Sequence, residues 1–355
     1  MAEVWVKAEH EYRIRITGDW RGDLNPSLTN RDRVAIIYSA NTANLIPSID
    51  PHGVSLTRIE IPDGEAGKSV STLDYVWRRL AEENFTRSDL IVGIGGGTVT
   101  DLAGFAAATW LRGIDWLAIP TTLAGMVDAS IGGKTGINSP YGKNLLGSFH
   151  SPREVLIDLQ WLPTLSDRDV AAGLAEVVKC GFIDDVEILD LMSGKTLTAI
   201  RNDLSLMNEL VLKAISTKAK VVSDDFRESE LREILNYGHT FGHAIEKASG
   251  FTLRHGEAVS IGMVFVAELS ASLGVMDPNY IEIHRSILSS IDLPVALGPH
   301  LASLHWDLLF RAMALDKKAR GSNIRFVAIT EPGHCTRLEN VNEEQLKAAY
   351  GKVLS

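Results

Sequence analysis

One segment in the second half of the chain carries four polar side chains at helical spacing. Arg232, Asn236, His239 and His243 are separated by four, three and four positions, which places them on one face of a predicted helix. The apolar residues around them predict that this face is buried. A buried row of arginine, asparagine and histidine costs free energy unless a ligand or metal satisfies it. The pattern predicts a functional site, and Thr240 excludes the zincin motif, which has glutamate at that position.

A second candidate is Glu176, which lies in an apolar helical context with Lys179 one turn later. One interpretation is an intrahelical ion pair, worth ~0.3 kcal/mol at a surface. The other is that Glu176 joins His239 and a third ligand on a metal ion, with His255, just before an apolar helix, as the best third ligand. One glutamate and two histidines leave coordination positions open, which is typical of a catalytic zinc.

The glycine run Gly95-Gly96-Gly97 follows an apolar strand and precedes a helix. Such a turn lets a phosphate approach backbone N–H groups at a helix N-terminus. The Rossmann fingerprint would need a further glycine where Thr98 stands, so nucleotide binding and a plain tight turn remain equal alternatives. Asp101, in the first helical turn, reaches a cofactor in the first case and complements the helix dipole in the second.

A fourth candidate is the small-residue segment from 128 to 144, which contains Lys134, Lys143 and Asn144. Its spacing does not match the P-loop pattern of four residues between glycine and Gly-Lys. An anion-binding loop and a solvated loop with ordinary lysines are equal alternatives for it.

The elements around these motifs predict two domains. Short apolar runs alternate with helical stretches in the first part of the chain, which predicts a mostly parallel sheet with helices on its faces. The strands are expected at residues 34–38, 56–61, 90–94, 116–119 and 155–158. Long helical patterns then dominate, at residues 170–180, 204–223, 228–248, 257–273 and 279–290. We therefore predict an α/β domain over residues 1–164 and a mainly α-helical domain over residues 165–355, with a ligand between them.

Composition limits the classes of partner. The 355 residues include 35 Lys and Arg against 45 Asp and Glu, a formal net charge of −10. That charge argues against nucleic acid and membrane surfaces as partners, because both attract positive proteins. Two cysteines, Cys180 and Cys335, are too few for a disulfide framework. With neither a signal peptide nor an apolar run of about 20 residues, we expect a cytoplasmic protein.

Taken in order, the motifs resemble those of the 3-dehydroquinate synthase family of sugar-phosphate cyclases. The resemblance spans roughly residues 55 to 330. The matching segments are Gly95-Gly96-Gly97 with Asp101, Pro120-Thr121-Thr122-Leu123, Gly132-Gly133-Lys134-Thr135, Gly142-Lys143-Asn144, Ala175-Glu176 with Lys179, Leu235-Asn236 with Gly238-His239, His255-Gly256-Glu257 and Asp316-Lys317-Lys318. The resemblance implies a dehydroquinate synthase-like fold, with an N-terminal nucleotide-binding domain.

The resemblance also implies site residues. Zinc, or cobalt in its place, would be held by Glu176, His239 and His255. NAD would contact Asp63, Glu65, Lys68, Gly96, Gly97, Asp101, Thr121, Thr122, Lys143, Leu162 and Thr164. The substrate would be surrounded by Asp128, Lys134, Asn144, Lys179, Lys218, Arg232, Asn236, His243 and Lys317 or Lys318. Arg112 would reach the neighbouring subunit's active site, which implies a homodimer. Where the family carries an acidic residue for the adenosine ribose, this chain offers Asn41.

The implied substrate is 3-deoxy-D-arabino-heptulosonate 7-phosphate, which brings about three negative charges to the site. The implied reaction oxidises the C5 hydroxyl transiently with NAD, eliminates phosphate, re-reduces the ketone and closes the ring to 3-dehydroquinate. His243 and Lys179 are the candidates for proton relay and charge stabilisation. Three alternatives remain open: an aminodehydroquinate synthase, another sugar-phosphate cyclase, and a metal- and NAD-dependent polyol dehydrogenase.

Overall fold

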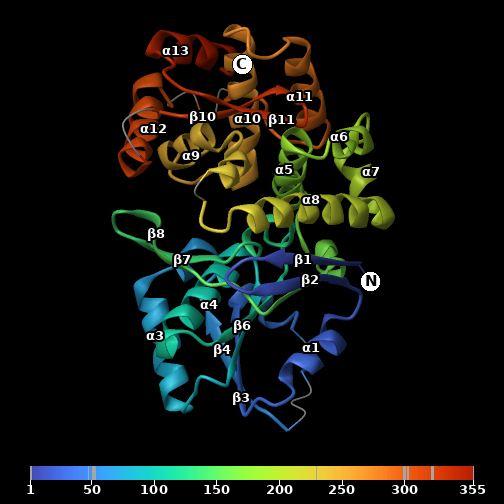
Figure 1. Cartoon of the computed structure of the whole chain (residues 1–355), viewed down its shortest axis with the longest axis vertical. Coiled ribbons are helices and arrows are strands. Elements are labelled where there is room, and N and C mark those ends of the chain that lie inside the picture. Colours follow the sequence, from blue (N-terminus) through green and yellow to red (C-terminus); the bar gives the residue numbers. More distant parts are fainter. Residues whose placement is uncertain are drawn as a thin grey trace. The chain divides into compact units, whose positions relative to one another are not determined.

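Two compact units make up the described part of the chain (Figure 1). The computed structural model describes residues 2–46, 48–49, 53–228, 230–298, 301, 304–320 and 324–354, and for residues 315–320 the helical backbone alone. Unit 1 comprises Met1–Leu165 with Lys218–Arg227, and unit 2 comprises Ser166–Thr217 with Glu228–Ser355. This division differs from the predicted split after residue 164 by one residue and by Lys218–Arg227, which the prediction placed in the second domain.

A seven-stranded sheet forms the centre of unit 1, in the order β1-β2-β9-β6-β5-β3-β4. The strands are β1 (Ala2–Lys7), β2 (Glu11–Thr17), β3 (Arg33–Ser39), β4 (Ser55–Ile61), β5 (Leu90–Gly95), β6 (Asp115–Pro120) and β9 (Glu154–Asp158). β1 and β2 are antiparallel, and every other neighbouring pair is parallel. The predicted parallel sheet is confirmed. It was recognisable in the sequence because strands that are buried on both faces consist of apolar residues. The β1–β2 hairpin was not predicted.

Helices and a separate hairpin surround this sheet. The helices are α1 (Trp20–Leu28), α2 (Ala40–Ala43), α3 (Val70–Glu82) and α4 (Gly97–Thr109), with short turns η1 (Gly64–Gly67), η2 (Trp110–Arg112), η3 (Gly125–Ala129) and η4 (Leu159–Thr164). The strands β7 (Lys134–Ser139) and β8 (Gly142–Phe149) pair antiparallel. β7 packs on α4, whereas most of β8 is exposed. The segment left open as a loop therefore contains a hairpin.

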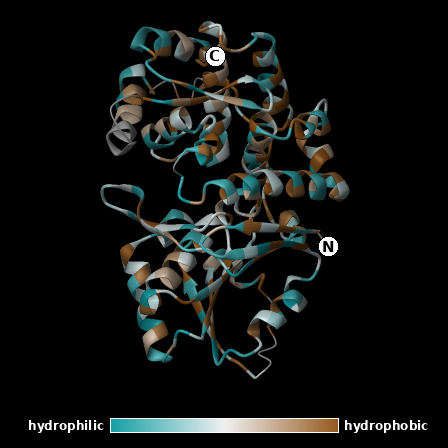
Figure 2. Cartoon of the chain, viewed as in Figure 1, coloured by the Kyte–Doolittle hydropathy of each residue, from teal (hydrophilic) through white to brown (hydrophobic). Residues whose placement is uncertain are grey.

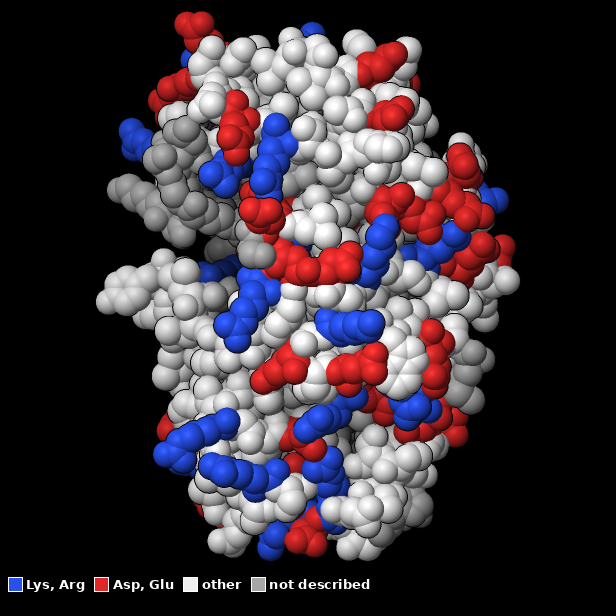
Figure 3. Space-filling view, viewed as in Figure 1, with Lys and Arg blue, Asp and Glu red and all other residues white. Residues whose placement is uncertain are grey.

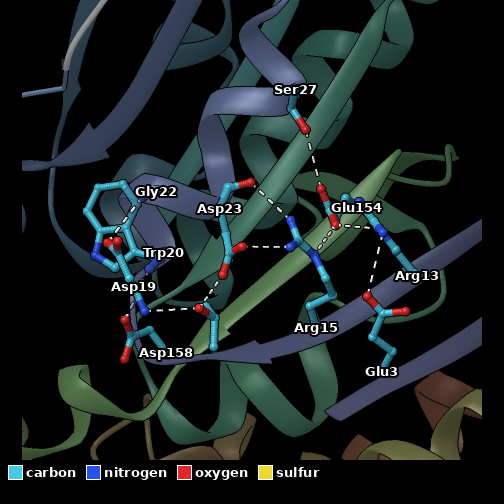
Figure 4. A network of polar contacts seen from close by, with 11 residues as sticks. Glu3, Arg13, Arg15, Asp19, Trp20, Gly22, Asp23, Ser27, Glu154 and Asp158 are labelled. Atoms are coloured by element: carbon cyan, nitrogen blue, oxygen red, sulfur yellow. Dashed lines mark hydrogen bonds and ion pairs between the residues drawn. The ribbon is translucent and has the colours of Figure 1, made fainter. Parts of the chain in front are cut away.

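A buried ionic network joins the N-terminal hairpin to the parallel sheet (Figure 4). The Arg15 side chain, on β2, donates from Nε to Glu154 Oε1 on β9 at 2.5 Å and from Nη1 to Asp23 Oδ1 on α1 at 2.8 Å. Arg13 donates to the same Glu154 oxygen at 2.7 Å. Removing one member would leave a buried charge without its partner, so the network fixes the β2–β9 register.

Unit 2 is mainly helical. Its elements are α5 (Asp167–Ile183), α6 (Glu187–Met192), α7 (Leu197–Asn202), α8 (Leu204–Asp224, whose last residues belong to unit 1), η5 (Leu231–Asn236), α9 (His239–Ala248), α10 (His255–Ser272), α11 (Asn279–Ser290), α12 (Trp306–Arg320), α13 (Glu343–Lys352) and the hairpin β10 (Phe326–Glu331) with β11 (His334–Leu338). Helices α5 and α10 are buried over almost their whole length, and their apolar residues form the core (Figure 2).

One predicted helix is wrong. The segment expected as a continuous helix over residues 228–248 contains the short turn η5, a break, and then α9. The break lies at Gly238, whose φ of 77° is a left-handed conformation that glycine adopts without strain. A side chain there would lie 2.7 Å from the Met263 side chain on α10. The close approach of α10 thus overrides the local helical pattern.

His284 lies at the centre of the unit 2 core. Its ring stacks on Phe182 at a centroid distance of 3.6 Å, and its Nδ1 donates to the Tyr280 carbonyl at 2.6 Å. Its Nε2 therefore accepts from the Tyr237 hydroxyl at 2.7 Å. Burial lowers the pKa of His284 to about 4, so the neutral ring is the form that the fold accommodates. His284 in this way anchors Tyr237, two residues before His239.

The surface carries charges of both signs. Figure 3 shows basic and acidic side chains interspersed over the visible face of each unit, without one large basic patch. Among the described residues, no helix combines the length and the apolar composition needed to cross a membrane.

We predict that stability falls in acid through His284. Because its pKa is about 4 in the folded chain and about 6.5 in the unfolded chain, the unfolded state binds the extra proton first. The stability present above pH 6.5 should decrease as the pH falls towards 4, by about 3 kcal/mol from this group. Urea unfolding of wild type and His284→Gln from pH 7 to 4 measures the effect. The variant should show a flatter profile, and parallel profiles would contradict the assignment.

Candidate active site

Three helices of unit 2 bring the predicted metal ligands together. Glu176 lies on α5, while His239 and His255 are the first residues of α9 and α10. Glycines allow the close approach that this requires. A Cβ on Gly256 would lie 2.0 Å from the Ala172 carbonyl oxygen of α5, and a Cβ on Gly262 would lie 1.9 Å from the carbonyl oxygen of Gly238. Any side chain at these two positions would separate the helices that carry the ligands.

The donor atoms converge on one carboxylate oxygen. His239 Nε2 lies 3.5 Å and His255 Nε2 3.2 Å from Glu176 Oε1. Neither contact has hydrogen-bond geometry, and the other oxygen of the buried Glu176 carboxylate, Oε2, ion-pairs with the Lys179 ammonium. Ligands of a tetrahedral ion with bonds of about 2.0–2.1 Å lie about 3.3 Å apart. The donor types and these two distances are compatible with a zinc-sized cation.

The other ring nitrogens hold the two histidines in the required orientation. His239 Nδ1 donates to the Tyr237 carbonyl at 3.0 Å, and His255 Nδ1 donates to Glu246 Oε2 at 3.1 Å. Each imidazole thus presents Nε2 to Glu176. A hydrogen bond from the remote nitrogen to a carbonyl or carboxylate is the usual support of a metal-binding histidine. Glu246 was not predicted, although it follows His239 by seven positions, on the same face of α9.

The pKa shifts of Glu176, His239 and His255 show that the buried Glu176 carboxylate requires positive charge around it. Burial alone would raise the pKa of Glu176, yet the Lys179 ammonium, with His239 and His255, holds that pKa well below its usual range. Burial and the Lys179 ammonium lower the pKa of His239, so its ring is neutral and its contact with Glu176 is not an ion pair. Although burial opposes it, the neighbouring carboxylates of Glu176 and Glu246 raise the pKa of His255 to about 10. A proton on His255 and a metal cation are alternative partners for one carboxylate.

Lys179 and His243 flank this group. Lys179 is 2% exposed and pairs with Glu176 one turn earlier on α5, so the predicted ion pair exists, but in the core. His243 is exposed, and its ring centroid lies 5.3 Å from that of His239. His239, His243 and His255 also form a compact group of three donors within 4.8 Å of one another. His243 is therefore an alternative to Glu176 as the third metal ligand, together with His239 and His255.

Two further predicted residues of unit 2, Arg232 and Asn236, lie in the turn η5 before α9. Arg232 is 1% exposed in η5. Asn236, at the end of η5, donates from Nδ2 to Glu228 Oε1 at 3.0 Å. Because the helix is broken, these two residues do not continue the helical face of His239 and His243. Lys317 and Lys318 fall in α12, where side chains lie outside the described residues.

In unit 1, the glycine run connects strand β5 to helix α4, which is the predicted strand–turn–helix order. Gly96 caps α4, which begins at Gly97 after strand β5. Asp101, in the second turn of α4, accepts from Lys68 Nζ at 2.5 Å. Burial raises the pKa of Asp101, and the Lys68 ammonium opposes that shift.

The remaining predicted cofactor residues also belong to unit 1. Thr121 is buried after β6 and its N–H donates to the Gly95 carbonyl at 2.9 Å, which joins the ends of two neighbouring strands. The other positions are Thr122 before η3, Leu162 and Thr164 in η4, and Lys143 in β8.

The turn Asp63–Lys68 is hydrogen-bonded to Asn41, the residue predicted to contact the adenosine ribose. Asp63 Oδ1 accepts from the backbone N–H of Asn41 at 2.9 Å, so the carboxylate and Asn41 lie side by side at the ends of β3 and β4. Glu65, in η1, ion-pairs with Lys143 at 3.7 Å. Carboxylates near the C-terminal ends of parallel strands are well placed for ribose hydroxyls.

The predicted substrate residues of unit 1 form two groups. Lys218 Nζ donates to the Asp128 backbone carbonyl at 2.5 Å and pairs with its carboxylate. Lys134 and Asn144 lie on the β7–β8 hairpin, where Asn144 accepts from Lys68 Nζ at 2.6 Å. Asn144 thus lies next to the predicted cofactor residues Lys68 and Asp101.

Sequence comparisons identify the family of this chain. The family described as 3-dehydroquinate synthase N-terminal matches residues 58–172, and the family described as 3-dehydroquinate synthase C-terminal matches residues 173–319. A curated 3-dehydroquinate synthase from Mycolicibacterium gilvum is 44% identical over 352 residues, which cover 98% of this chain and 97% of the relative.

Solved structures with the same fold include other sugar-phosphate cyclases. A 2-epi-5-epi-valiolone synthase from Streptomyces hygroscopicus, with NAD+ and Zn2+ bound, has a TM-score of 0.87 and 27% identity, covering 99% of this chain and 98% of that chain. A 2-deoxy-scyllo-inosose synthase complexed with carbaglucose-6-phosphate, NAD+ and Co2+ has a TM-score of 0.88 and 23% identity, covering 99% of this chain and 100% of that chain. The predicted fold class is confirmed. The chain belongs to the 3-dehydroquinate synthase family.

Proposed function

We propose that this chain converts 3-deoxy-D-arabino-heptulosonate 7-phosphate into 3-dehydroquinate and phosphate, with NAD and Zn2+ or Co2+ as cofactors. The observation that carries the proposal is the convergence of His239 Nε2 and His255 Nε2 on the buried Glu176 carboxylate. Family membership supports the reaction, since the curated relatives bear this name. The cyclases with NAD+ and Zn2+ or Co2+ bound support the cofactors.

The two cofactors divide the chemistry of the reaction. Glu176, His239 and His255 would hold the metal, which would supply a Lewis acid that lowers the pKa of a substrate hydroxyl, and NAD would supply reversible hydride transfer. Glu246 and the Tyr237 carbonyl orient the two imidazoles.

Basic and amide side chains provide for the anionic substrate. Arg232 binds the substrate carboxylate bidentately, because its planar guanidinium presents parallel N–H donors. Lys134, Asn144, Lys218 and Asn236 are hydrogen-bond donors for the phosphate and hydroxyls, and Asp128 positions Lys218. Lys179 and His243 stabilise charge and relay protons beside the metal ligands. Lys317 or Lys318, both of which lie on α12, is the remaining predicted contact of the substrate.

The substrate charge also separates this function from its alternatives. A neutral polyol has no use for the lysines and for Arg232, so a polyol dehydrogenase leaves these residues without a role. Arg232 also favours a carboxylate-bearing substrate over the other sugar phosphates. It is compatible with the amino analogue of the substrate, and the names of the curated relatives favour the dehydroquinate reaction.

We propose a homodimer in which Arg112 reaches the neighbouring active site. Arg112 is exposed at the end of η2. Leu111, Arg112 and Gly113 have φ values of 50°, 68° and 122°, three positive values in succession. Such a conformation is costly for leucine and arginine and is typical of sites where the backbone presents a functional side chain.

We also place the protein in the cytoplasm, because Cys180 and Cys335 are not joined in a disulfide.

The activity test uses purified protein with zinc, NAD and the heptulosonate phosphate. We expect one phosphate released per 3-dehydroquinate formed, and no net NADH, because the same cofactor is oxidised again in each turnover. Phosphate assay, product chromatography and absorbance at the NADH band measure the three quantities. Steady accumulation of NADH without phosphate release, or turnover of a neutral polyol, would show a dehydrogenase instead.

The choice of third metal ligand predicts different effects for Glu176→Gln and His243→Ala. Glu176→Gln should weaken zinc binding by more than the 10- to 100-fold that loss of an outer hydrogen-bond partner typically costs, and should abolish turnover. His243→Ala should keep the metal and lose turnover, because His243 relays protons. Metal content after dialysis, measured by mass spectrometry, separates the two. Zinc lost from His243→Ala but kept by Glu176→Gln would assign His243 as the ligand.

Mixed dimers test the role of Arg112. Arg112→Ala and Glu176→Gln should each be inactive alone. In a heterodimer of the two, one site combines an intact Glu176 with the intact Arg112 of the other subunit. Randomly mixed subunits should therefore recover about a quarter of wild-type activity. No recovery from heterodimers isolated by two different tags would show that Arg112 acts within its own subunit.

A further inference from the structure

The β7–β8 hairpin contains an irregular stretch at the point where it carries predicted site residues. Ile137 pairs with Leu146 and Ser139 pairs with Gly142, so Asn138 alone faces the three residues 143–145. Within this bulge Asn144 has a φ of 55°, in the left-handed region. Bulges near active sites redirect side chains, and this one presents Lys143 and Asn144.

Asn138 fills the gap in the ladder. Its Oδ1 accepts from the backbone N–H of Asn144 at 3.0 Å, which holds the bulge. Its Nδ2 donates to Glu65 Oε2 at 2.5 Å, and its backbone N–H donates to the Lys68 carbonyl at 2.9 Å. A side-chain amide combines an acceptor and a donor, so one residue spans from the bulge to the turn that carries Glu65 and Lys68.

Lys68 makes a second connection between the same two segments. Its side chain is 4% exposed, and its Nζ donates to Asn144 Oδ1 at 2.6 Å and Asp101 Oδ2 at 2.5 Å. A buried ammonium needs such partners, so Asn144 and Asp101 are held at a fixed separation. The ion pair of Lys143 with Glu65 adds a third connection on the exposed side.

We infer that Asn138 is a positioning residue that fixes the Lys143–Asn144 bulge to the cofactor turn and thereby couples NAD binding to substrate binding. The inference rests on the proposed function and on the family resemblance, which implies Glu65, Lys68 and Asp101 as NAD contacts and Asn144 as a substrate contact. A ligand that orders the turn also orders the bulge, so the second ligand loses less conformational freedom. The coupling is reciprocal: each ligand tightens binding of the other by the same factor.

The test compares Asn138→Ala, Asn138→Asp and, as a matched control, Asn202→Ala at the exposed end of α7. NAD affinity is measured by calorimetry, with and without a phosphonate analogue of the substrate that cannot eliminate phosphate. Hydrogen exchange of residues 143–146 reports the bulge directly. In wild type and Asn202→Ala, the analogue should tighten NAD binding at least about 5-fold, and NAD should protect the bulge.

The two Asn138 variants separate the two bonds of the side chain. Asn138→Ala should lose the coupling and the protection, raise the substrate KM and lower kcat. Asn138→Asp keeps the acceptor for the Asn144 N–H but replaces the donor to Glu65 by a negative charge. It should keep a protected bulge without coupling, even where Asn138→Ala is too unstable to purify.

Two results would overturn the inference in distinguishable ways. If both Asn138 variants bind NAD with wild-type coupling and wild-type protection, Asn138 has no positioning role and the proposed function still stands. If zinc-loaded wild type binds no NAD, the assignment of the turn fails, and both the proposed function and the inference fall with it.

Discussion

The buried charge of Glu176 is the constraint on which the rest of unit 2 depends. A carboxylate that is 1% exposed is tolerated only when positive charge and hydrogen-bond donors surround it. Lys179 supplies part of that charge from the same helix, and the Nε2 atoms of His239 and His255 lie 3.5 Å and 3.2 Å from Glu176 Oε1. The close contacts at Gly256 and Gly262 follow from the same constraint, because the three helices must approach until the donors meet.

A second constraint operates in unit 1, where a protein of net charge −10 must bind anions. The structure places its lysines among carboxylates rather than in a broad positive surface. Lys68 lies against Asp101, Lys143 against Glu65, and Lys218 against Asp128. Each of these ammonium groups is therefore held in one position and is compensated by a carboxylate. Fixed local donors of this kind, predicted to serve NAD at Lys68 and Lys143 and the substrate at Lys218, are compatible with an overall charge that repels polyanions.

Local sequence patterns predicted much of the fold. The strands β3, β5, β6 and β9 are apolar runs because both of their faces are buried. Helices α5 and α10 were predicted from the long helical patterns at residues 170–180 and 257–273. The three predicted metal ligands followed from the family motifs, and the structure brings their side chains together.

The features that the sequence did not predict have a common physical cause, because each depends on contacts between residues that are distant in sequence. The break at Gly238 depends on the approach of α10, which no local periodicity contains. The β7–β8 hairpin is short of alternating apolar residues because most of β8 faces outward. Glu246 and Asn138 act only through partners distant in sequence, His255 and Glu65. Such residues become recognisable once the helices and strands that carry their partners are in place.

The most direct measurement is anomalous diffraction at the zinc absorption edge from crystals grown with zinc. The account predicts one peak in unit 2, about 2.0–2.2 Å from a Glu176 oxygen, His239 Nε2 and His255 Nε2. A peak bound by His243 in place of Glu176, or no peak at these residues, would contradict it.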